Sequence, residues 1–203
     1  MSNETHINIH SIIPLSKING PGKRMVIFFQ GCNKRCHGCF NPATHSFDTV
    51  TLHSPEDILK KSLLNDIEGI TVSGGEPFLQ HNGLFELLKM AKNKYNLTTV
   101  VYTGFTYEEL KENAYYFQCL DFIDVLVDGR YDETKKEPTL LARGSTNQRF
   151  YFISNRYTEK DFYMPGKTEI IIGKNGVIKA TGFGKPPHLA PHTKDFGVRA
   201  REK

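Results

Sequence analysis

Short apolar strands alternate with amphipathic helices over most of this chain. Buried strands are predicted for four runs rich in Val, Ile and aromatic residues, at 25–29, 70–72, 98–102 and 122–127. Helices are predicted between them, beginning at the N-cap residue Ser54, near Asn82, and at a capping box that opens with Thr106. This alternation is typical of βα units built around a largely parallel sheet, so we predict an α/β fold.

The composition is that of an ordinary globular protein. The chain has 203 residues, of which 38% are hydrophobic and 24% charged. No apolar run approaches the roughly 20 residues that cross a bilayer, and the polar N-terminus does not resemble a signal peptide. We therefore expect a cytoplasmic protein without membrane association. A net charge of +4 is too small to indicate direct nucleic-acid binding.

The alternation of strands and helices ends after about residue 131. A strand is predicted at 148–153, and a hairpin over 169–180 is predicted from the Asn-Gly turn at Asn175. The segment from residue 182 onward is rich in Gly, Pro and Lys. We therefore expect one domain over 1–155 and a C-terminal extension over 156–203, which comprises a small β hairpin and a flexible basic tail.

Three of the four cysteines lie within eight residues of each other. Cys32, Cys36 and Cys39 have a Cys-x3-Cys-x2-Cys spacing, and three neighbouring thiols cannot all pair as disulfides. Together they are suited to bind one metal centre. Cys119 is distant in sequence and has apolar neighbours, which predicts a buried thiol.

Three cysteine ligands leave a four-coordinate centre one ligand short. In a zinc site, His37, His45 or Cys119 would supply the fourth ligand. In a [4Fe–4S] cluster, one iron would keep an open coordination position. The presence of only one tight Cys-x2-Cys pair favours the cluster over zinc.

A second motif, Ser-Gly-Gly-Glu-Pro at 73–77, directly follows the second predicted strand. Gly74 and Gly75 expose backbone amides and carbonyls, and Glu76 adds a carboxylate. Such a surface is suited to bind the ammonium and carboxylate groups of an amino acid. The alternative is a tight turn that only closes the strand.

These motifs together resemble the radical S-adenosylmethionine superfamily. The resemblance includes Gly-Pro-Gly-Lys-Arg at 20–24, the cysteine loop with its Phe-Asn-Pro continuation at 40–42, and the motif at 73–77. Within the superfamily, the chain is most similar to the glycyl-radical-enzyme activating proteins of the anaerobic (class III) ribonucleoside-triphosphate reductase. The runs that support this subfamily are 102–106, 123–129 and 143–149. The resemblance covers residues 18 to 150, and about fifty residues follow it.

The resemblance implies a partial (β/α) TIM-type barrel with one [4Fe–4S] cluster. Cys32, Cys36 and Cys39 would hold three irons, and S-adenosylmethionine would bind the fourth. Reductive cleavage of this cofactor would give a 5′-deoxyadenosyl radical, which takes a hydrogen atom from a glycine of a large partner enzyme. The expected partner is an anaerobic ribonucleotide reductase, and the expected electron donor is a flavodoxin or a ferredoxin.

The resemblance also assigns residues to the cofactor. Gly74, Gly75 and Glu76 would bind the methionine ammonium group, and the backbone around Gly38 and Phe40 would line the cofactor, with Phe40 near the adenine. Asp128 is expected to make a polar contact with the cofactor or the target, and the alternative is a residue that only ends the strand. Arg143 and Asn147 are expected to orient the partner's loop, and the alternative is that they only hold the last strand in place.

Two other functions remain open at this point. One is a radical S-adenosylmethionine enzyme that modifies a peptide or a small molecule, with the C-terminal extension forming part of its substrate site. The other is a non-catalytic module that binds zinc or a cluster. Both would use the same cysteine loop.

Overall fold

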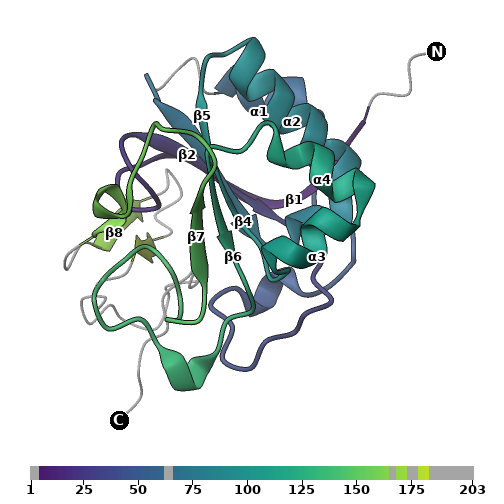
Figure 1. Cartoon of the computed structure of the whole chain (residues 1–203). Helices are drawn as coiled ribbons and strands as arrows, with labels where there is room; N and C mark the ends of the chain where they lie inside the picture. The colour runs from purple at the N-terminus through teal and green to yellow at the C-terminus, as the bar shows by residue number, and fades with distance from the viewer. Residues whose placement is uncertain (1–4, 62–65, 165–167, 173–177, 183–203) are drawn as a thin grey trace.

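The computed structural model describes residues 5–61, 66–164, 168–172 and 178–182 (Figure 1). Its centre is a seven-stranded sheet with the strand order β3-β1-β2-β4-β5-β6-β7. In chain order the strands are β1 (Ile7–Ser16), β2 (Arg24–Phe29), β3 (Leu52–His53), β4 (Gly69–Gly74), β5 (Thr98–Tyr102), β6 (Val125–Asp128) and β7 (Arg149–Phe152).

The middle of the sheet is parallel and its flanks are antiparallel. β2, β4, β5 and β6 pair in parallel, whereas β1 pairs antiparallel with β2 and β3, and β7 pairs antiparallel with β6. The α/β class and the parallel centre are thus confirmed. The sheet does not close, because β3 and β7 form its two edges, and a TIM-type barrel is not observed.

Four helices cover one face of the sheet (Figure 1). They are α1 (Pro55–Lys60), α2 (His81–Asn93), α3 (Tyr107–Glu112) and α4 (Ala114–Leu120). The predicted caps are present: Ser54 accepts from Asp57 N, and Thr106 forms a reciprocal capping box with Glu109. The helix predicted to begin near Asn82 corresponds to α2, and residues 62–65, shortly after α1, lie outside the described residues.

Apolar side chains from strands and helices form one large core on the helix-covered face. Met25, Ile27 and Phe29 of β2 belong to it, as do Leu84 and Leu87 of α2. All five are fully buried. Successive residues of a strand point to opposite faces, so the other β2 residues contribute to the second face.

The second face of the sheet carries two smaller apolar clusters. One contains Ile13, Val26 and Phe28. The other consists of Val100, Val125, Ala142, Phe162 and Met164. The short 3-10 helix η5 (Glu159–Phe162) brings Phe162 to this face. The strand β4 lies between the strands that carry the two clusters.

Arg24, the last residue of the 20–24 motif, ties three strands together at one end of the sheet. Its guanidinium is fully buried and donates to Thr71 Oγ1 at 2.9 Å, to Ile70 O at 2.6 Å and to Thr98 O at 3.1 Å. Burial lowers the pKa of this guanidinium. The motif therefore has a structural role, because the cysteine loop lies at the opposite end of β2.

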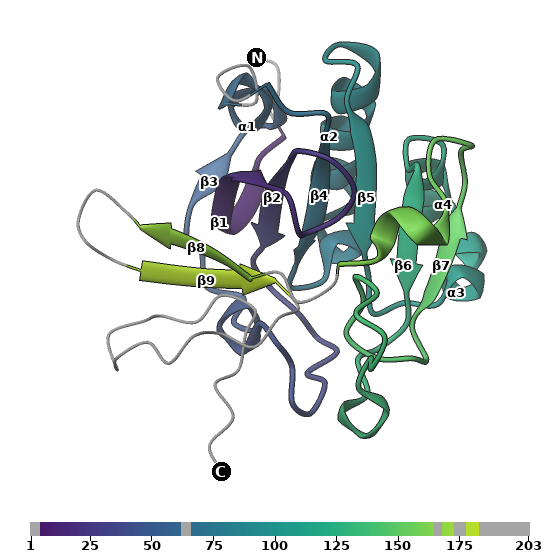
Figure 2. The same cartoon turned by 90° about the vertical axis from the view of Figure 1, so that its left-hand side faces the viewer.

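The predicted C-terminal hairpin is present as β8 (Thr168–Ile172) and β9 (Ile178–Gly182). Figure 2 shows this pair apart from the main sheet, on the side of β1 and β2. Its contact with the body includes a hydrogen bond from Lys17 N to Glu169 Oε1 at 2.7 Å. The Asn-Gly turn and the tail after residue 182 lie outside the described residues, and the domain boundary at residue 155 stays a prediction.

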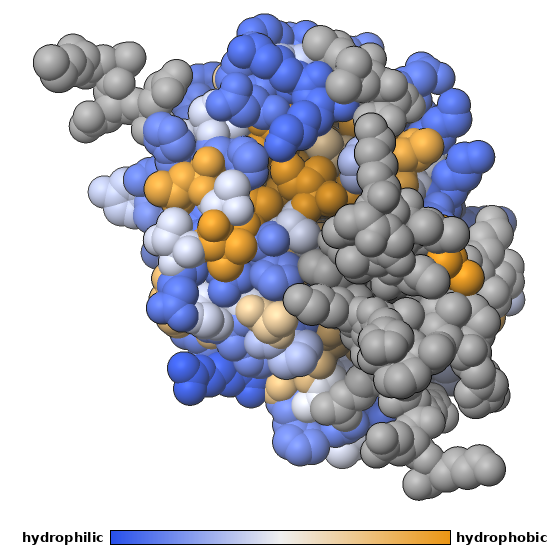
Figure 3. Space-filling model, turned by 180° about the vertical axis from the view of Figure 1, so that it is seen from behind, coloured by the Kyte–Doolittle hydropathy of each residue, from blue (hydrophilic) through white to orange (hydrophobic). Residues whose placement is uncertain are grey.

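The β1–β3 edge leaves some apolar surface uncovered. Leu15, Phe47, Val50 and Leu52 are between 39% and 60% exposed. The space-filling view from behind shows apolar patches within a mostly hydrophilic surface (Figure 3). Among the helices that the structure describes, none is long and apolar enough to cross a membrane.

Candidate functional site

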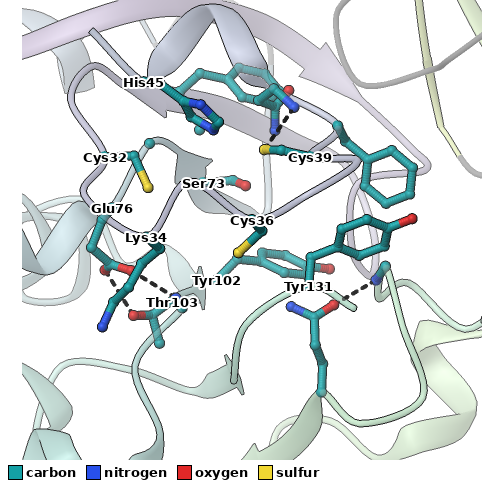
Figure 4. Close-up of a pocket in the computed structure, with 18 of the residues that line it drawn as sticks. Cys32, Lys34, Cys36, Cys39, His45, Ser73, Glu76, Tyr102, Thr103 and Tyr131 are labelled. Atoms are coloured by element: carbon teal, nitrogen blue, oxygen red, sulfur yellow. Dashed lines mark hydrogen bonds between the residues drawn. The ribbon is translucent and has the colours of Figure 1, made fainter. Parts of the chain in front are cut away.

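The loops that follow β2, β4 and β5 meet at one end of the sheet and surround a cleft (Figure 4). Parallel strands place their carboxyl ends at the same edge, which is why three sequence-distant loops converge here. The cleft is lined by the three clustered cysteines, by the glycine-rich turn after β4, and by the start of the loop after β5.

Cys32, Cys36 and Cys39 all line this cleft, and none of them forms a disulfide. The loop that carries them is fixed at its base by hydrogen bonds from Gly31 N to Thr44 O at 2.9 Å and from Cys32 N to His45 O at 3.4 Å. Gly31 has a φ of 95°, a backbone conformation that residues with a Cβ atom rarely adopt. The structure thus brings together the three predicted metal ligands.

Backbone amides support the cysteine sulfurs. Asn41 N donates to Cys39 Sγ at 3.4 Å. Burial raises the pKa of the Cys32 thiol, and backbone hydrogen bonds from Lys34 and Arg35 oppose that rise. Amide donors to sulfur are among the features that tune iron–sulfur centres. A set of three soft donors with such amides fits a cluster.

A single metal ion and a [4Fe–4S] cluster require different arrangements of three thiols. Within the described part of the chain, no three His, Cys, Asp or Glu side chains are grouped so as to hold one metal ion. In a [4Fe–4S] cluster each thiolate binds a different iron, so the three thiols surround the centre instead of meeting at one point.

The Gly-Gly turn after β4 packs directly against the start of the cysteine loop. Gly75 N donates to Phe29 O and Glu76 N donates to Gly31 O, both at 2.8 Å. A Cβ on Gly74 would lie 2.6 Å from Phe29 N, and one on Gly75 would lie 2.3 Å from Gly31 O. Glycine is required at both positions because two backbones approach each other closely.

Glu76 is buried in the wall of the cleft and joins the ends of β4 and β5. Its carboxylate accepts hydrogen bonds from Thr103 Oγ1 at 2.8 Å, Gly104 N at 2.7 Å and Phe78 N at 3.1 Å. Burial raises the pKa of Glu76, and these three hydrogen bonds work against the rise. The carboxylate is therefore held in one orientation by the protein itself.

Lys34 connects the cysteine loop to the loop after β5. Its Nζ lies 3.3 Å from the centroid of the Phe105 ring, a cation–π contact. The Lys34 charge also opposes the rise in the pKa of Glu76. Sequence reasoning did not single out Lys34, although the Tyr-Thr-Gly-Phe-Thr run at 102–106 pointed to the loop that it contacts.

Phe40 lines the cleft, whereas Gly38 is not among its lining residues. The Phe40 ring lies 4.7 Å from the Tyr131 ring, centroid to centroid, and remains 36% exposed. Gly38 has a φ of 71°, and a Cβ there would lie 2.6 Å from the Glu133 carboxyl carbon. Gly38 therefore lets the cysteine loop pass close to the segment around Glu133.

The structure does not place the Asp128 side chain in the cleft. Its carboxylate is fully buried and accepts from Tyr107 N at 2.7 Å, from Arg149 Nη2 at 2.6 Å and from Arg149 Nε at 3.1 Å. Only the next residue, Gly129, reaches the cleft lining. Asp128 thereby fixes the start of α3 and the antiparallel strand β7 to the end of β6.

Arg143 and Asn147 also make internal contacts. Arg143 donates to Gln148 O at 2.8 Å and forms an ion pair with Glu137, and Asn147 donates to Arg130 O at 2.8 Å. These contacts agree with the structural alternative, in which both residues pin the loop before β7.

Cys119 is a buried thiol, as predicted. It lies in α4 within the helix-covered core and is fully shielded from solvent. Burial raises its pKa to about 12. It is therefore protonated at neutral pH and is separate from the three cleft cysteines.

The comparison with protein families matches residues 18–151 to the family described as "4Fe-4S single cluster domain". This region contains all three cleft cysteines, the Gly-Gly turn and the loop after β5. It ends at β7, before the C-terminal hairpin.

Several curated proteins are similar to this chain over most of their own length. The anaerobic ribonucleoside-triphosphate reductase-activating protein of Escherichia coli K12 is 35% identical over 70% of this chain and 96% of its own. The proteins of the same name from Pasteurella multocida and phage T4 are 32% and 30% identical, over 71% of this chain and 97% and 94% of their own. The chain belongs to the family of anaerobic ribonucleoside-triphosphate reductase-activating proteins.

Proposed function

We propose that this protein is a radical S-adenosylmethionine enzyme that activates an anaerobic ribonucleoside-triphosphate reductase. The observation that carries the proposal is the convergence of three thiols and the Gly-Gly-Glu turn on one cleft, in a chain of the activating-protein family. A [4Fe–4S] cluster and S-adenosylmethionine, when bound, supply the one-electron chemistry that forms a 5′-deoxyadenosyl radical.

Cys32, Cys36 and Cys39 would hold the cluster. Their loop is fixed at its base, and amides are already directed at two of the three sulfurs. Because three ligands leave one iron open, the amino and carboxylate groups of S-adenosylmethionine are suited to complete the centre.

Gly74, Gly75 and Glu76 would bind the methionine end of the cofactor. A carboxylate has about four acceptor sites, and three hydrogen bonds from the protein leave capacity for one more donor. Glu76 lines the cleft, so an ammonium group is a suitable fourth donor. Burial makes such a charge-assisted contact stronger than it would be in water.

Phe40 and Tyr131 would provide an aromatic wall for the adenine. The two rings contact each other and both line the cleft. Gly38 would act by shaping the loop that presents Phe40. Asp128 is left out of the cofactor contacts, because Tyr107 and Arg149 hold its carboxylate outside the cleft.

The partner would present a glycine-bearing loop to this cleft. The sheet is open, with β3 and β7 at its edges, and such an incomplete wall would leave the cofactor within reach of another protein. The partner would be a large glycyl-radical reductase, and the electron would come from a flavodoxin or a ferredoxin.

Anaerobic reconstitution with iron and sulfide tests the cluster assignment. The expected result is a visible cluster chromophore, with matching iron and sulfide content and no bound zinc. Purified protein that takes up zinc and forms no cluster would instead support the non-catalytic module.

The activity is tested with an anaerobic ribonucleoside-triphosphate reductase as the substrate protein. Mixed with the reconstituted protein, S-adenosylmethionine and dithionite, the reductase should show a glycyl-radical signal by electron paramagnetic resonance. The same mixture without S-adenosylmethionine is the control. If the cofactor is cleaved and no radical forms on the reductase, the substrate is instead a peptide or small molecule.

A further inference from the structure

His45 lies at the end of the cysteine loop, directly after the 3-10 helix η1 (Pro42–Thr44). Its backbone oxygen accepts the hydrogen bond from Cys32 N at 3.4 Å, so the residue is tied to the first cysteine. Its side chain lines the cleft together with the three thiols. Figure 4 shows the ring projecting into the cleft on the side of Cys32 and Cys39.

One nitrogen of this ring has no partner. Among the described residues, three buried side-chain polar atoms make no hydrogen bond: Ser11 Oγ, His45 Nε2 and Glu169 Oε2. Only the His45 atom belongs to a residue that lines the cleft. Buried polar groups are nearly always hydrogen-bonded in folded proteins, so an unpaired nitrogen at a ligand site indicates a ligand atom.

The surroundings indicate what kind of atom this is. The three cysteines line the same cleft as His45, and as thiolate ligands they accept hydrogen bonds and do not donate them. An iron–sulfur centre held by these ligands adds inorganic sulfides, which are acceptors as well. A neutral imidazole can satisfy such an acceptor by donating from Nε2 while it leaves the metal coordination unchanged.

We propose that His45 is a positioning residue that donates a hydrogen bond from Nε2 to a sulfur of the cluster and thereby raises its reduction potential. This inference rests on the proposed function, because it requires the cluster. A reduced centre carries one more negative charge than an oxidised one, so a hydrogen-bond donor stabilises the reduced form more strongly. The cluster is then easier to reduce by an external one-electron donor.

The test is a potentiometric titration of the reconstituted full-length protein with dithionite, in the absence of S-adenosylmethionine. The reduced cluster is followed by electron paramagnetic resonance. His45→Leu should shift the midpoint to a more negative potential, and His45→Gln, which restores an N–H donor, should recover part of the shift. His53→Leu is the matched control, because His53 lies in β3 outside the cleft lining, and it should leave the midpoint unchanged.

Two results would overturn the inference. The first is a His45→Leu protein with full iron and sulfide content and the wild-type midpoint. The second is a shift that occurs only when S-adenosylmethionine is present, which would make the cofactor the acceptor. If the wild-type protein loads no cluster at all, the proposed function fails, which is a distinguishable outcome.

A second measurement covers variants that do not fold or load. Wild-type protein labelled with 15N-histidine should show a magnetic coupling between a histidine nitrogen and the reduced cluster by pulsed electron paramagnetic resonance. His45→Gln protein should lack that coupling. An absence of coupling in the wild-type protein would also overturn the assignment.

Discussion

The two faces of the sheet are built on different principles. The helix-covered face holds one continuous apolar core that includes residues from all four helices. The other face splits its apolar residues into two small clusters on either side of a cleft lined by thiols, glycines and a buried carboxylate. The first face supplies stability through packing, and the second is organised by hydrogen bonds that position groups for a ligand.

The largest effect is expected on cluster binding, when a cysteine of each face is replaced by alanine. Cys36→Ala should abolish cluster binding and reductase activation, because one iron loses its protein ligand. Cys119→Ala, in the helix-covered core, should bind the cluster almost as well as the wild type. Iron and sulfide analysis after reconstitution measures both. Equal losses in the two variants would contradict the assignment of three ligands on one face.

Truncation of the large core should affect stability and spare the site. Leu87 of α2 is fully buried in that core, so Leu87→Ala should lower the free energy of unfolding by about 2–5 kcal/mol. Urea unfolding of the protein before reconstitution measures the loss. Cluster content per folded molecule should stay at the wild-type value. A lower cluster content per folded molecule would show that the two faces are coupled.

Removal of the Lys34 charge should have a smaller, local effect. Lys34→Met keeps the aliphatic chain and removes the cation from the Phe105 ring, for an expected loss of about 0.5–2 kcal/mol in stability. A double-mutant cycle with Phe105→Leu isolates the contact. If the two losses simply add, the cation–π pair does not join the loops.

The smallest effect is expected at the surface pair of Glu108 and Arg149. Arg149 Nη2 lies 2.6 Å from Glu108 Oε2, and this contact lowers the pKa of Glu108 from 4.5 to about 2. A carboxyl group with a depressed pKa in the folded state adds stability above its unfolded pKa and loses it as the pH falls toward the folded value.

Glu108→Gln should therefore be slightly less stable than the wild type at pH 7, and the two should converge as the pH falls from 4.5 toward about 2. Thermal unfolding across this pH range measures the difference. Salt should also reduce it, because the Glu108 side chain is exposed. A constant difference at all pH values would mean that charge is not its origin.

The sequence predicted the parts of the fold that depend on local patterns. The strands β2, β4, β5 and β6 appear as continuous apolar runs, since a parallel strand buried on both faces has no polar alternation. The strand β1 was missed, because its alternation of Ile7 and Ile9 with polar residues is short and stops at Ser11, where the pairing with β2 shifts register. The helix α4 was missed because it is only seven residues long and follows α3 directly.

The sequence predicted which motifs form the site. It did not predict the contacts between the side chains of the site. Spacing predicted that Cys32, Cys36 and Cys39 would lie together, and the parallel sheet brought the Gly-Gly turn beside them. The direction of the Asp128 side chain depends on Arg149, twenty-one positions away, and no local signal reveals such a partner. The contact of Lys34 with Phe105 and the unpaired Nε2 of His45 depend on how the loops fold against each other, and no local pattern reveals them.

The hydrogen bonds between the Gly-Gly turn and the cysteine loop have a consequence for protein engineering. Gly75 N bonds to Phe29 O and Glu76 N bonds to Gly31 O, so the two loops share one backbone network. A cysteine loop transplanted alone into another α/β scaffold would lack the surface that fixes its first residues. The smallest transferable unit is therefore the pair of neighbouring strands β2 and β4 with both of their loops.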